Sequence, residues 1–149
     1  EVYLKRGENL LFNGTIEEDW GWVFYNDEEA PLASQAHSGH WSLRVPAGDG
    51  VKGLWSMPIP ASRRVRLHFW YRVPENAGLS IKFPLFKTKY AWLQRYLEVV
   101  SLSSTNGQWT AYDRVIEFKD TEATHIKLEM TAAGGDCLID EIEIMPVKD

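Results

Sequence analysis

The chain has 149 residues and a mass of 17.1 kDa, which fits one compact domain over residues 1–149. It carries 16 basic and 21 acidic groups but one cysteine, which excludes a disulfide-rich miniprotein, and no spacing of cysteine and histidine matches a zinc site. No apolar run approaches the roughly 20 residues of a membrane-spanning helix, so we expect no membrane partner. Because the chain begins at Glu1 without a methionine, we expect an excised piece of a longer product, with residues 1–8 as a linker.

Short strands with period-two alternation are predicted along the chain, and no window of a dozen residues shows a helical stripe. In chain order, the expected strands are Asn9–Phe12, Val23–Asn26, Trp41–Val45, Gly53–Ile59, Arg66–Val73, Leu79–Phe86, Tyr96–Ser101, Trp109–Phe118, Thr124–Met130 and Leu138–Ile144. Turn-forming glycine, asparagine and proline residues separate these strands. Many short strands without crossover helices predict an all-β fold, an antiparallel β-sandwich of the jelly-roll kind.

Alternation also assigns a face to each side chain. In the strand Arg66–Val73, the neighbours of Trp70 belong to the core face, so His68, Trp70 and Arg72 are expected on the opposite face. An exposed indole beside a guanidinium is typical of a binding surface, and Trp55 and Lys82 are expected to extend it from other strands. The alternative is that a loop buries Trp70, which would then be structural.

A second candidate for binding is the segment 87–96, which interleaves three basic residues with three aromatic ones. Tyr90, Trp92 and Arg95 are its candidate ligand-binding residues, because such a segment between two strands has the composition of a recognition loop. Single-strand nucleic-acid binders show a similar interleaving. The acidic net charge and the absence of a nucleic-acid-binding signature argue against that partner.

Charge is segregated along the chain. Residues 30–98 carry 10 basic and 3 acidic groups, a net +7, whereas residues 1–29 and 99–149 each carry a net −6. All the candidate binding residues lie in the basic segment, which favours a ligand bearing carboxylates or sulfates. A neutral ligand is the alternative, because acidic strands packed nearby would neutralise the basic groups.

Three spaced signatures carry a resemblance to a known group of proteins. They are Asn9–Glu17 followed by Trp20-Gly21-Trp22, then Ala36–Val45, and finally Leu138–Ile144. In this order they resemble carbohydrate-binding modules with the galactose-binding-like jelly roll, such as families four, nine, sixteen and twenty-two. The resemblance implies a non-catalytic, extracellular module that attaches a polysaccharide-degrading enzyme to its glycan. Its partners would then be a polysaccharide and the catalytic domain of the same polypeptide, a glycoside hydrolase or polysaccharide lyase.

The same resemblance implies a structural calcium ion that ties the first strand to the last. The positions that match its ligands are Glu17 and Asp140, supplemented by carbonyl oxygens of the turn Ser38-Gly39-His40. Such a site is chemically reasonable because calcium prefers several oxygen ligands at about 2.3–2.6 Å. The alternative is that the two acidic residues serve only a turn and a strand end.

Two other classes of function remain open from the sequence. A structural jelly-roll domain of such an enzyme would bind no sugar, and a small lyase or hydrolase would need a catalytic pair. Glu98 and Glu129 are candidates for that pair if they face each other across the sheet. No Gly-x-Ser-x-Gly motif is present, and Cys137 lies in a run that is expected to be buried. The sequence therefore favours binding over catalysis.

Overall fold

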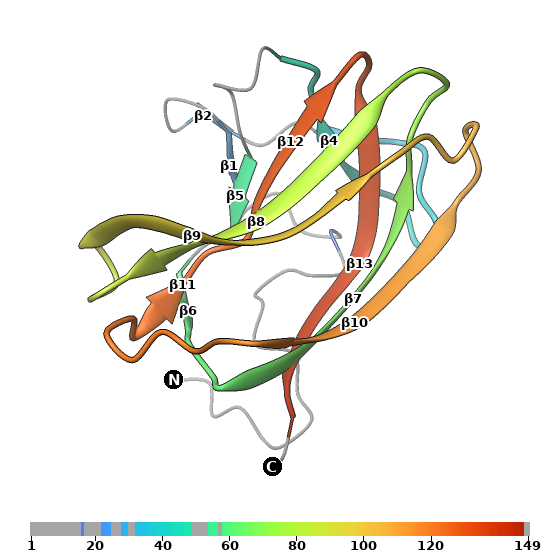
Figure 1. Cartoon of the computed structure of the whole chain (residues 1–149). Helices are drawn as coiled ribbons and strands as arrows, with labels where there is room; N and C mark the ends of the chain where they lie inside the picture. Colours follow the sequence, from blue (N-terminus) through green and yellow to red (C-terminus); the bar gives the residue numbers. More distant parts are fainter. Residues whose placement is uncertain are drawn as a thin grey trace.

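The computed structural model describes residue 16 and the segments 22–24, 28–29, 32–48, 54–56 and 58–147. These residues form thirteen strands and no helix, arranged as two antiparallel sheets that pack face to face (Figure 1). None of the described residues forms a helix long and apolar enough to cross a membrane. The predicted first strand, Asn9–Phe12, lies outside the described residues.

The larger sheet has eight strands in the order β2-β1-β5-β12-β8-β11-β6, and β9 pairs with β8. Their bounds are β1 Trp22–Phe24, β2 Glu28–Glu29, β5 Leu54–Ser56, β6 Ile59–Pro60, β8 Gly78–Phe86, β9 Trp92–Leu102, β11 His125–Ile126 and β12 Glu129–Ala133. Strands β11 and β12 lie end to end beside β8, because His125 is paired with Phe86 and Glu129 with Lys82. Strand β8 is therefore flanked by β12 and β9, a position that becomes important for the site.

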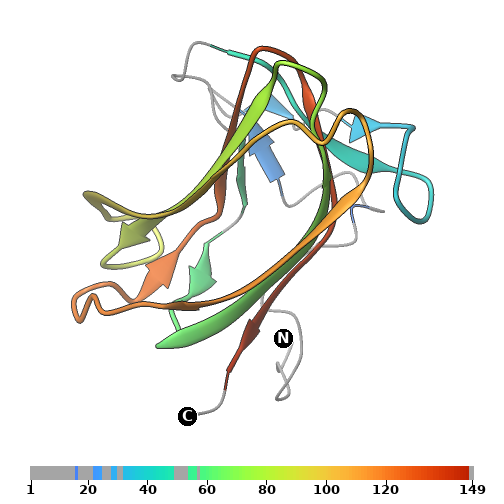
Figure 2. The same ribbon diagram turned by 45° about the vertical axis from the view of Figure 1, so that its right-hand side comes forward.

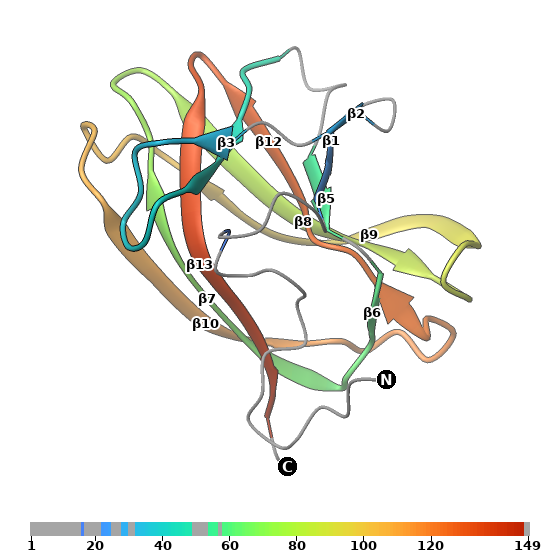
Figure 3. The same cartoon turned by 180° about the vertical axis from the view of Figure 1, so that it is seen from behind.

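The smaller sheet has five strands in the order β10-β7-β13-β4-β3, seen from behind in Figure 3. Their bounds are β3 Leu32–Ala33, β4 Ser42–Val45, β7 Arg64–Arg72, β10 Thr110–Glu117 and β13 Cys137–Pro146. A β-bulge interrupts the pairing of β13 with β7 between Asp140 and Glu143, and Glu141 has a φ of 50° there. The bulge resets the alternation, so Asp140 faces outward and Ile142 still reaches the core.

The core fills the space between the two layers, which Figure 2 shows from another side. Strand β7 alternates as predicted, with Val65, Leu67 and Phe69 fully buried between more exposed neighbours. Strand β8 supplies the facing row, in which Ile81 and Phe83 are also fully buried. Each such side chain stabilises the fold by about 1.5–3 kcal/mol relative to leaving it in water. The predicted jelly-roll sandwich is confirmed.

Strand boundaries differ from the prediction in several places. The short strands β2 and β3 were not predicted, and the predicted strand Gly53–Ile59 holds β5 and the first residue of β6. The segment Thr124–Met130 divides into β11 and β12 because the N–H of Leu128 donates to the Ser56 side-chain oxygen at 2.9 Å instead of to a ladder partner. Strand β9 begins at Trp92, four residues earlier than expected, because Trp92 pairs with Phe86 across an irregular register. The longer β9 places two aromatic residues beside β8.

Candidate functional site

The residues that the sequence marked for binding are divided between the outer faces of the two sheets. Lys82 and Trp92 face outward from the larger sheet, whereas Trp70 faces outward from β7 of the smaller sheet, together with His68 and Arg72. The prediction that Lys82 and Trp55 extend the surface around Trp70 is therefore wrong, because the whole core separates the two groups. The structure offers two separate surfaces.

On the larger sheet, an ion pair lies at the centre of the outer face. The Lys82 ammonium group is 3.2 Å from a carboxylate oxygen of Glu129, and the two residues are direct cross-strand neighbours on β8 and β12. Glu129 is only 6% exposed although it faces outward. The backbone of Trp55 on β5 is paired with Glu129 on the other side. One row across the sheet therefore holds Trp55, Glu129 and Lys82.

Two aromatic rings on β9 adjoin this ion pair. The Lys82 nitrogen lies 4.2 Å from the centre of the Tyr96 ring, a cation–π arrangement. The Tyr96 and Trp92 rings are 5.6 Å apart and inclined at 61°, and they remain 42% and 46% exposed. We call the surface formed by Lys82, Trp92, Tyr96 and Glu129 the aromatic face. It combines exposed rings with a charged, partly desolvated centre.

The electrostatics of the aromatic face keep the Tyr96 phenol neutral. Burial raises the pKa of Tyr96, the nearby Glu129 carboxylate raises it further, and Lys82 opposes them. A neutral phenol both donates and accepts a hydrogen bond, whereas the Glu129 carboxylate only accepts and the Lys82 ammonium only donates. The face therefore offers every hydrogen-bonding role to a ligand with many hydroxyl groups.

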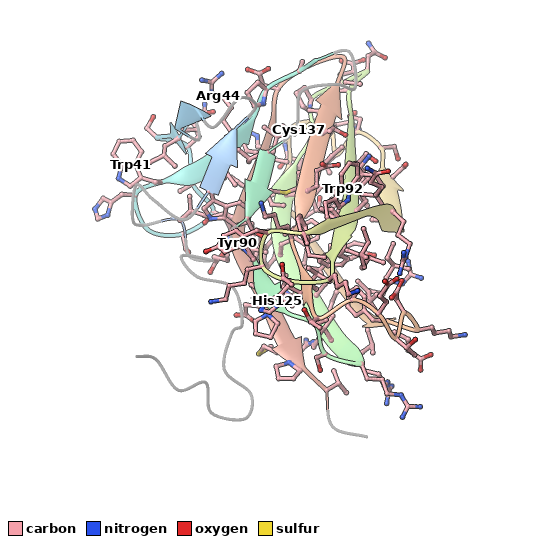
Figure 4. The ribbon with its side chains drawn as sticks, turned by 90° about the vertical axis from the view of Figure 1, so that its left-hand side faces the viewer. Trp41, Arg44, Tyr90, Trp92, His125 and Cys137 are labelled. Atoms are coloured by element: carbon pink, nitrogen blue, oxygen red, sulfur yellow. The ribbon has the colours of Figure 1, made fainter. Side chains whose placement is uncertain are left out.

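The aromatic face continues toward the loop that joins β8 to β9. Tyr90 lies on this loop and is 89% exposed, and the loop faces the viewer in Figure 4. Lys127 places its ammonium group 5.1 Å from the centre of the Phe86 ring on the same outer surface. Arg95 does not join this surface as a free cation, because it donates hydrogen bonds to Asp120 at 2.7 Å and to Glu122 at 2.8 Å.

The outer face of the smaller sheet differs because part of the chain covers it. The ring of His37 stacks on Trp70 with centroids 3.8 Å apart and also meets the edge of Trp109 at 5.8 Å. The Nδ1 atom of His37 in turn lies in hydrogen-bond contact with a carboxylate oxygen of Glu141 on β13. Trp70 is therefore half-buried under the segment before β4, the alternative that the sequence had left open.

Of the proposed metal ligands, the structure describes Asp140 and the turn Ser38-Gly39-His40. Asp140 is fully buried, and its carboxylate accepts hydrogen bonds from the backbone N–H groups of His37, Ser38 and Glu141. Burial raises the pKa of Asp140 despite these bonds. His40 is exposed, Glu17 lies outside the described residues, and the described part of the chain holds no group of three or more acidic, histidine or cysteine residues arranged for a metal.

The residues considered for catalysis do not form a catalytic pair or an activated nucleophile. Lys82 on β8 separates Glu98 from Glu129, so the two glutamates are not direct neighbours across the sheet. Burial raises the pKa of the Cys137 thiol to about 11, which leaves it protonated at neutral pH. Trp41, which directly precedes β4, is 42% exposed and points away from the sandwich (Figure 4).

Sequence reasoning did not include Tyr96 and Glu129 among the candidate binding residues, although the structure places both on the aromatic face. Both lay in predicted strands, and Glu129 already alternated with the buried Leu128 and Met130. The sequence therefore indicated that the Glu129 side chain points outward from its strand, as the predicted binding residue Lys82 does from another strand. What the sequence did not contain was the register that pairs Glu129 with Lys82 from a strand 47 residues later in the chain.

No protein-family model matches the chain, and no curated protein sequence matches it either. Many solved structures share its fold. The xylan-binding, first family 22 module of a Paenibacillus barcinonensis protein superposes with a TM-score of 0.74 at 17% identity, covering 99% of both chains. The fold is that of the carbohydrate-binding modules.

Other matches extend this likeness beyond one family. A family 61 module in complex with β-1,4-galactotriose has a TM-score of 0.60 at 19% identity, covering 94% of this chain and 99% of the module. A Clostridium thermocellum xylanase fragment, which joins a family 22 module to a family 10 glycoside hydrolase module and is complexed with xylohexaose, has a TM-score of 0.71 at 11% identity. That match covers 97% of this chain and 29% of the fragment. The jelly-roll fold inferred from the three sequence signatures is thereby confirmed.

Proposed function

We propose that the chain is a non-catalytic carbohydrate-binding module that holds a polysaccharide chain on its aromatic face. The observation that carries this proposal is the ion pair between half-buried Lys82 and buried Glu129, beside two exposed rings. A pyranose ring packs its apolar face on an aromatic side chain, and its hydroxyl groups bond to the charged groups between. Exposed aromatic rings without a binding role would need no desolvated carboxylate, such as that of Glu129, beside them.

The inclination of the two rings bears on the kind of glycan. A flat, ribbon-like chain presents successive sugar faces nearly parallel, whereas Trp92 and Tyr96 are inclined at 61°. Platforms at this angle suit a twisted chain in solution better than a flat crystalline surface. The neighbouring modules described above are named for xylan or are complexed with β-1,4-galactotriose, so soluble β-linked chains are the first ligands to try.

The charge of the ligand divides two versions of this proposal. The basic segment favours an anionic glycan, but its cations are largely paired with acidic residues of the C-terminal segment. These ion pairs are Arg44–Asp136, Arg64–Glu117, Arg66–Asp113, Lys82–Glu129 and Arg95 with Asp120 and Glu122. The pairing supports a neutral glycan on the aromatic face. Affinity for a neutral glycan should hardly change between 0.1 M and 1 M salt, where the Debye length falls from about 10 to about 3 Å, whereas affinity for an anionic glycan should fall steadily.

The decisive experiment is a calorimetric titration of the chain with xylohexaose, galactotriose and an acidic oligosaccharide. We expect saturable binding that Tyr96→Ala reduces at least thirtyfold, about 2 kcal/mol, because a central ring is removed. Trp41→Ala is the matched control, since Trp41 is equally exposed but directly precedes β4 of the other sheet, and it should bind like the unchanged chain. Absence of binding to any glycan on a broad array would instead support a structural accessory domain.

The calcium ion is a separate part of the proposal. A fully buried Asp140 carboxylate whose pKa is raised by burial is a suitable ligand, because a cation would compensate its desolvation. We expect exhaustive chelation to lower the melting temperature by several degrees without unfolding the chain at room temperature. An unchanged melting curve, with no metal found by elemental analysis, would contradict the site.

The biological role that fits such a module is delivery of an enzyme to its substrate. A module on a linker raises the local concentration of an attached catalytic domain at the glycan, even when each contact is weak. We propose that the parent polypeptide is a secreted glycoside hydrolase or polysaccharide lyase. Comparing the full polypeptide with a Tyr96→Ala version on insoluble and soluble substrate tests this, since only the insoluble substrate should be hydrolysed more slowly.

A further inference from the structure

A hollow lies on the outside of the smaller sheet, on the opposite side of the core from the aromatic face. Its volume is about 350 Å³, which is at the small end of the range of about 300–1,000 Å³ for ligand sites. It lies between the end of β3, the turn that joins β9 to β10, and the neighbouring strands β4, β13 and β7. Its lining includes Gln35, Arg44, Arg72, Pro74, Gly107 and Leu138.

Strand register brings two guanidinium groups to this hollow. Leu138 on β13 is paired with Arg44 on one side and with Arg72 on the other, so the apolar side chain lies between the two arginines. Arg44 is paired with Asp136 at 3.1 Å, and the second carboxylate oxygen of Asp136 accepts the N–H of Ala47 at 2.8 Å. These two bonds, with the backbone bond the larger, lower the pKa of Asp136 and keep it ionised.

Arg72 is bound differently from the other arginines of the basic segment. Its Nε donates to the carbonyl oxygen of Gly107 at 2.6 Å, which fixes the direction of the guanidinium plane. Within the described residues no carboxylate lies at ion-pair distance from Arg72, and its two terminal amino groups have no protein acceptor. The lining therefore contains two guanidinium groups against one carboxylate, and the uncompensated positive charge is on Arg72.

The turn at Gly107 keeps this guanidinium accessible. Gly107 has a φ of +75°, a conformation that side chains other than glycine adopt at a cost. A Cβ atom built there would lie 3.9 Å from a terminal nitrogen of Arg72. At that distance a Cβ atom would be in ordinary contact with the guanidinium, so glycine leaves this side of the Arg72 group free of any side chain.

We infer that this hollow binds a single hexuronic acid unit, at the end or on a branch of a glycan. The two free amino groups of Arg72 match the two oxygens of a carboxylate, the strongest geometry available to arginine. Leu138 and Pro74 supply apolar surface for the sugar ring, and the exposed amide of Gln35 supplies donors and an acceptor for hydroxyl groups. The combination of a carboxylate, an apolar ring face and hydroxyl groups on one small molecule defines a uronic acid.

The test is a titration followed by backbone amide NMR shifts, with the methyl glycoside of glucuronic acid as the probe. The methyl glycoside of glucose is the matched neutral ligand, and acetate represents a carboxylate alone. We expect the amide signals of Arg72, Gly107 and Leu138 to shift and saturate with the glucuronide in the millimolar range, and not with the glucoside. Equal shifts with all sugars, shifts centred on Lys82 and Tyr96, or equal binding of acetate would each overturn the inference.

Variants assign the binding to Arg72. Arg72→Gln should weaken glucuronide binding at least tenfold, whereas Arg66→Gln, on the same strand and face but paired with Asp113, should leave it unchanged. If Arg72→Gln does not fold, Arg72→Lys keeps the charge but loses the planar pair of donors, so an intermediate loss is expected. Undiminished binding by a folded Arg72 variant would overturn the assignment. Tyr96→Ala should bind the glucuronide normally, which keeps this test separate from that of the aromatic face.

Discussion

The outer faces of the two sheets contain similar residues but present them differently. Both carry aromatic rings beside acidic and basic groups. On the larger sheet Trp92 and Tyr96 stay exposed beside the Lys82–Glu129 pair, whereas on the smaller sheet His37 covers Trp70 and three backbone N–H groups occupy the Asp140 carboxylate. The comparison teaches that a covering segment, and not the residue types in a strand, decides whether an outward aromatic residue is available to a ligand.

If the smaller sheet's outer face is structural, the largest effect on stability should come from Asp140. Asp140→Ala removes the acceptor of three backbone N–H groups in a buried place, and we expect a loss of about 3 kcal/mol in the free energy of unfolding. Denaturant unfolding measures this loss. Asp113→Ala is the control on the same sheet, because Asp113 is exposed and its pair with Arg66 is worth about 1 kcal/mol or less. Equal losses in the two variants would remove the distinction between them.

Replacing Trp92 or Trp70 by alanine compares the outer faces of the two sheets most directly. Trp92→Ala should lower glycan affinity about thirtyfold, or about 2 kcal/mol, and leave the unfolding free energy nearly unchanged, because the ring is exposed. Trp70→Ala should do the reverse and destabilise the fold by about 2 kcal/mol, because it removes the ring on which His37 stacks. Calorimetry with xylohexaose and thermal melting of both variants measure the two effects. Loss of glycan affinity in a stable Trp70→Ala variant would restore the smaller sheet as the binding surface.

A smaller effect is expected from the cation of the aromatic face. Lys82→Met keeps most of the unbranched side chain but removes the ion pair with Glu129 and the cation beside Tyr96. We expect about a tenfold loss of affinity and, because Lys82 lowers the pKa of Tyr96, a further rise of that pKa. Titration with xylohexaose and ultraviolet absorbance of the phenolate check these outcomes. An unchanged affinity would show that the ion pair only stabilises the sheet.

The smallest expected effects concern how the free energy of unfolding depends on pH through the carboxyl groups of Asp120 and Asp140. Arg95, together with the N–H groups of Ala123 and Glu122, lowers the pKa of Asp120 to about 2. Its stabilising contribution is complete above its unfolded pKa of about 3.9 and is lost as the pH falls toward 2. Burial raises the pKa of Asp140 in the calcium-free chain, so there its contribution is greatest at low pH and is lost as the pH rises through its folded value.

Unfolding measured from pH 6 to pH 2 tests these opposite signs. Asp120→Asn should flatten the loss of stability below pH 4, because the group that must be protonated is gone. Asp140→Asn should steepen that loss, because it removes a group that favours the folded state in acid. The same slope in both variants would contradict the assignment.

The sequence by itself determined most of the strands and the inward side of the longer ones. Alternation of apolar and polar residues reports burial directly, because neighbouring side chains of a strand point to opposite faces. Phe69 is therefore buried as predicted, and His68 is not. The fold class followed from the number of such strands and from the three spaced signatures, and the comparison with solved structures confirmed it.

The tertiary structure alone decided which outward residues share a surface. Register between distant strands places Glu129 beside Lys82, and the layer to which a strand belongs separates Trp70 from both. Long-range contacts also decide exposure, since His37 reaches Trp70 from 33 positions earlier in the chain. Alternation indicates only that a side chain points away from the core. Whether it then meets solvent, another strand or a covering loop depends on pairings between segments that no local pattern encodes.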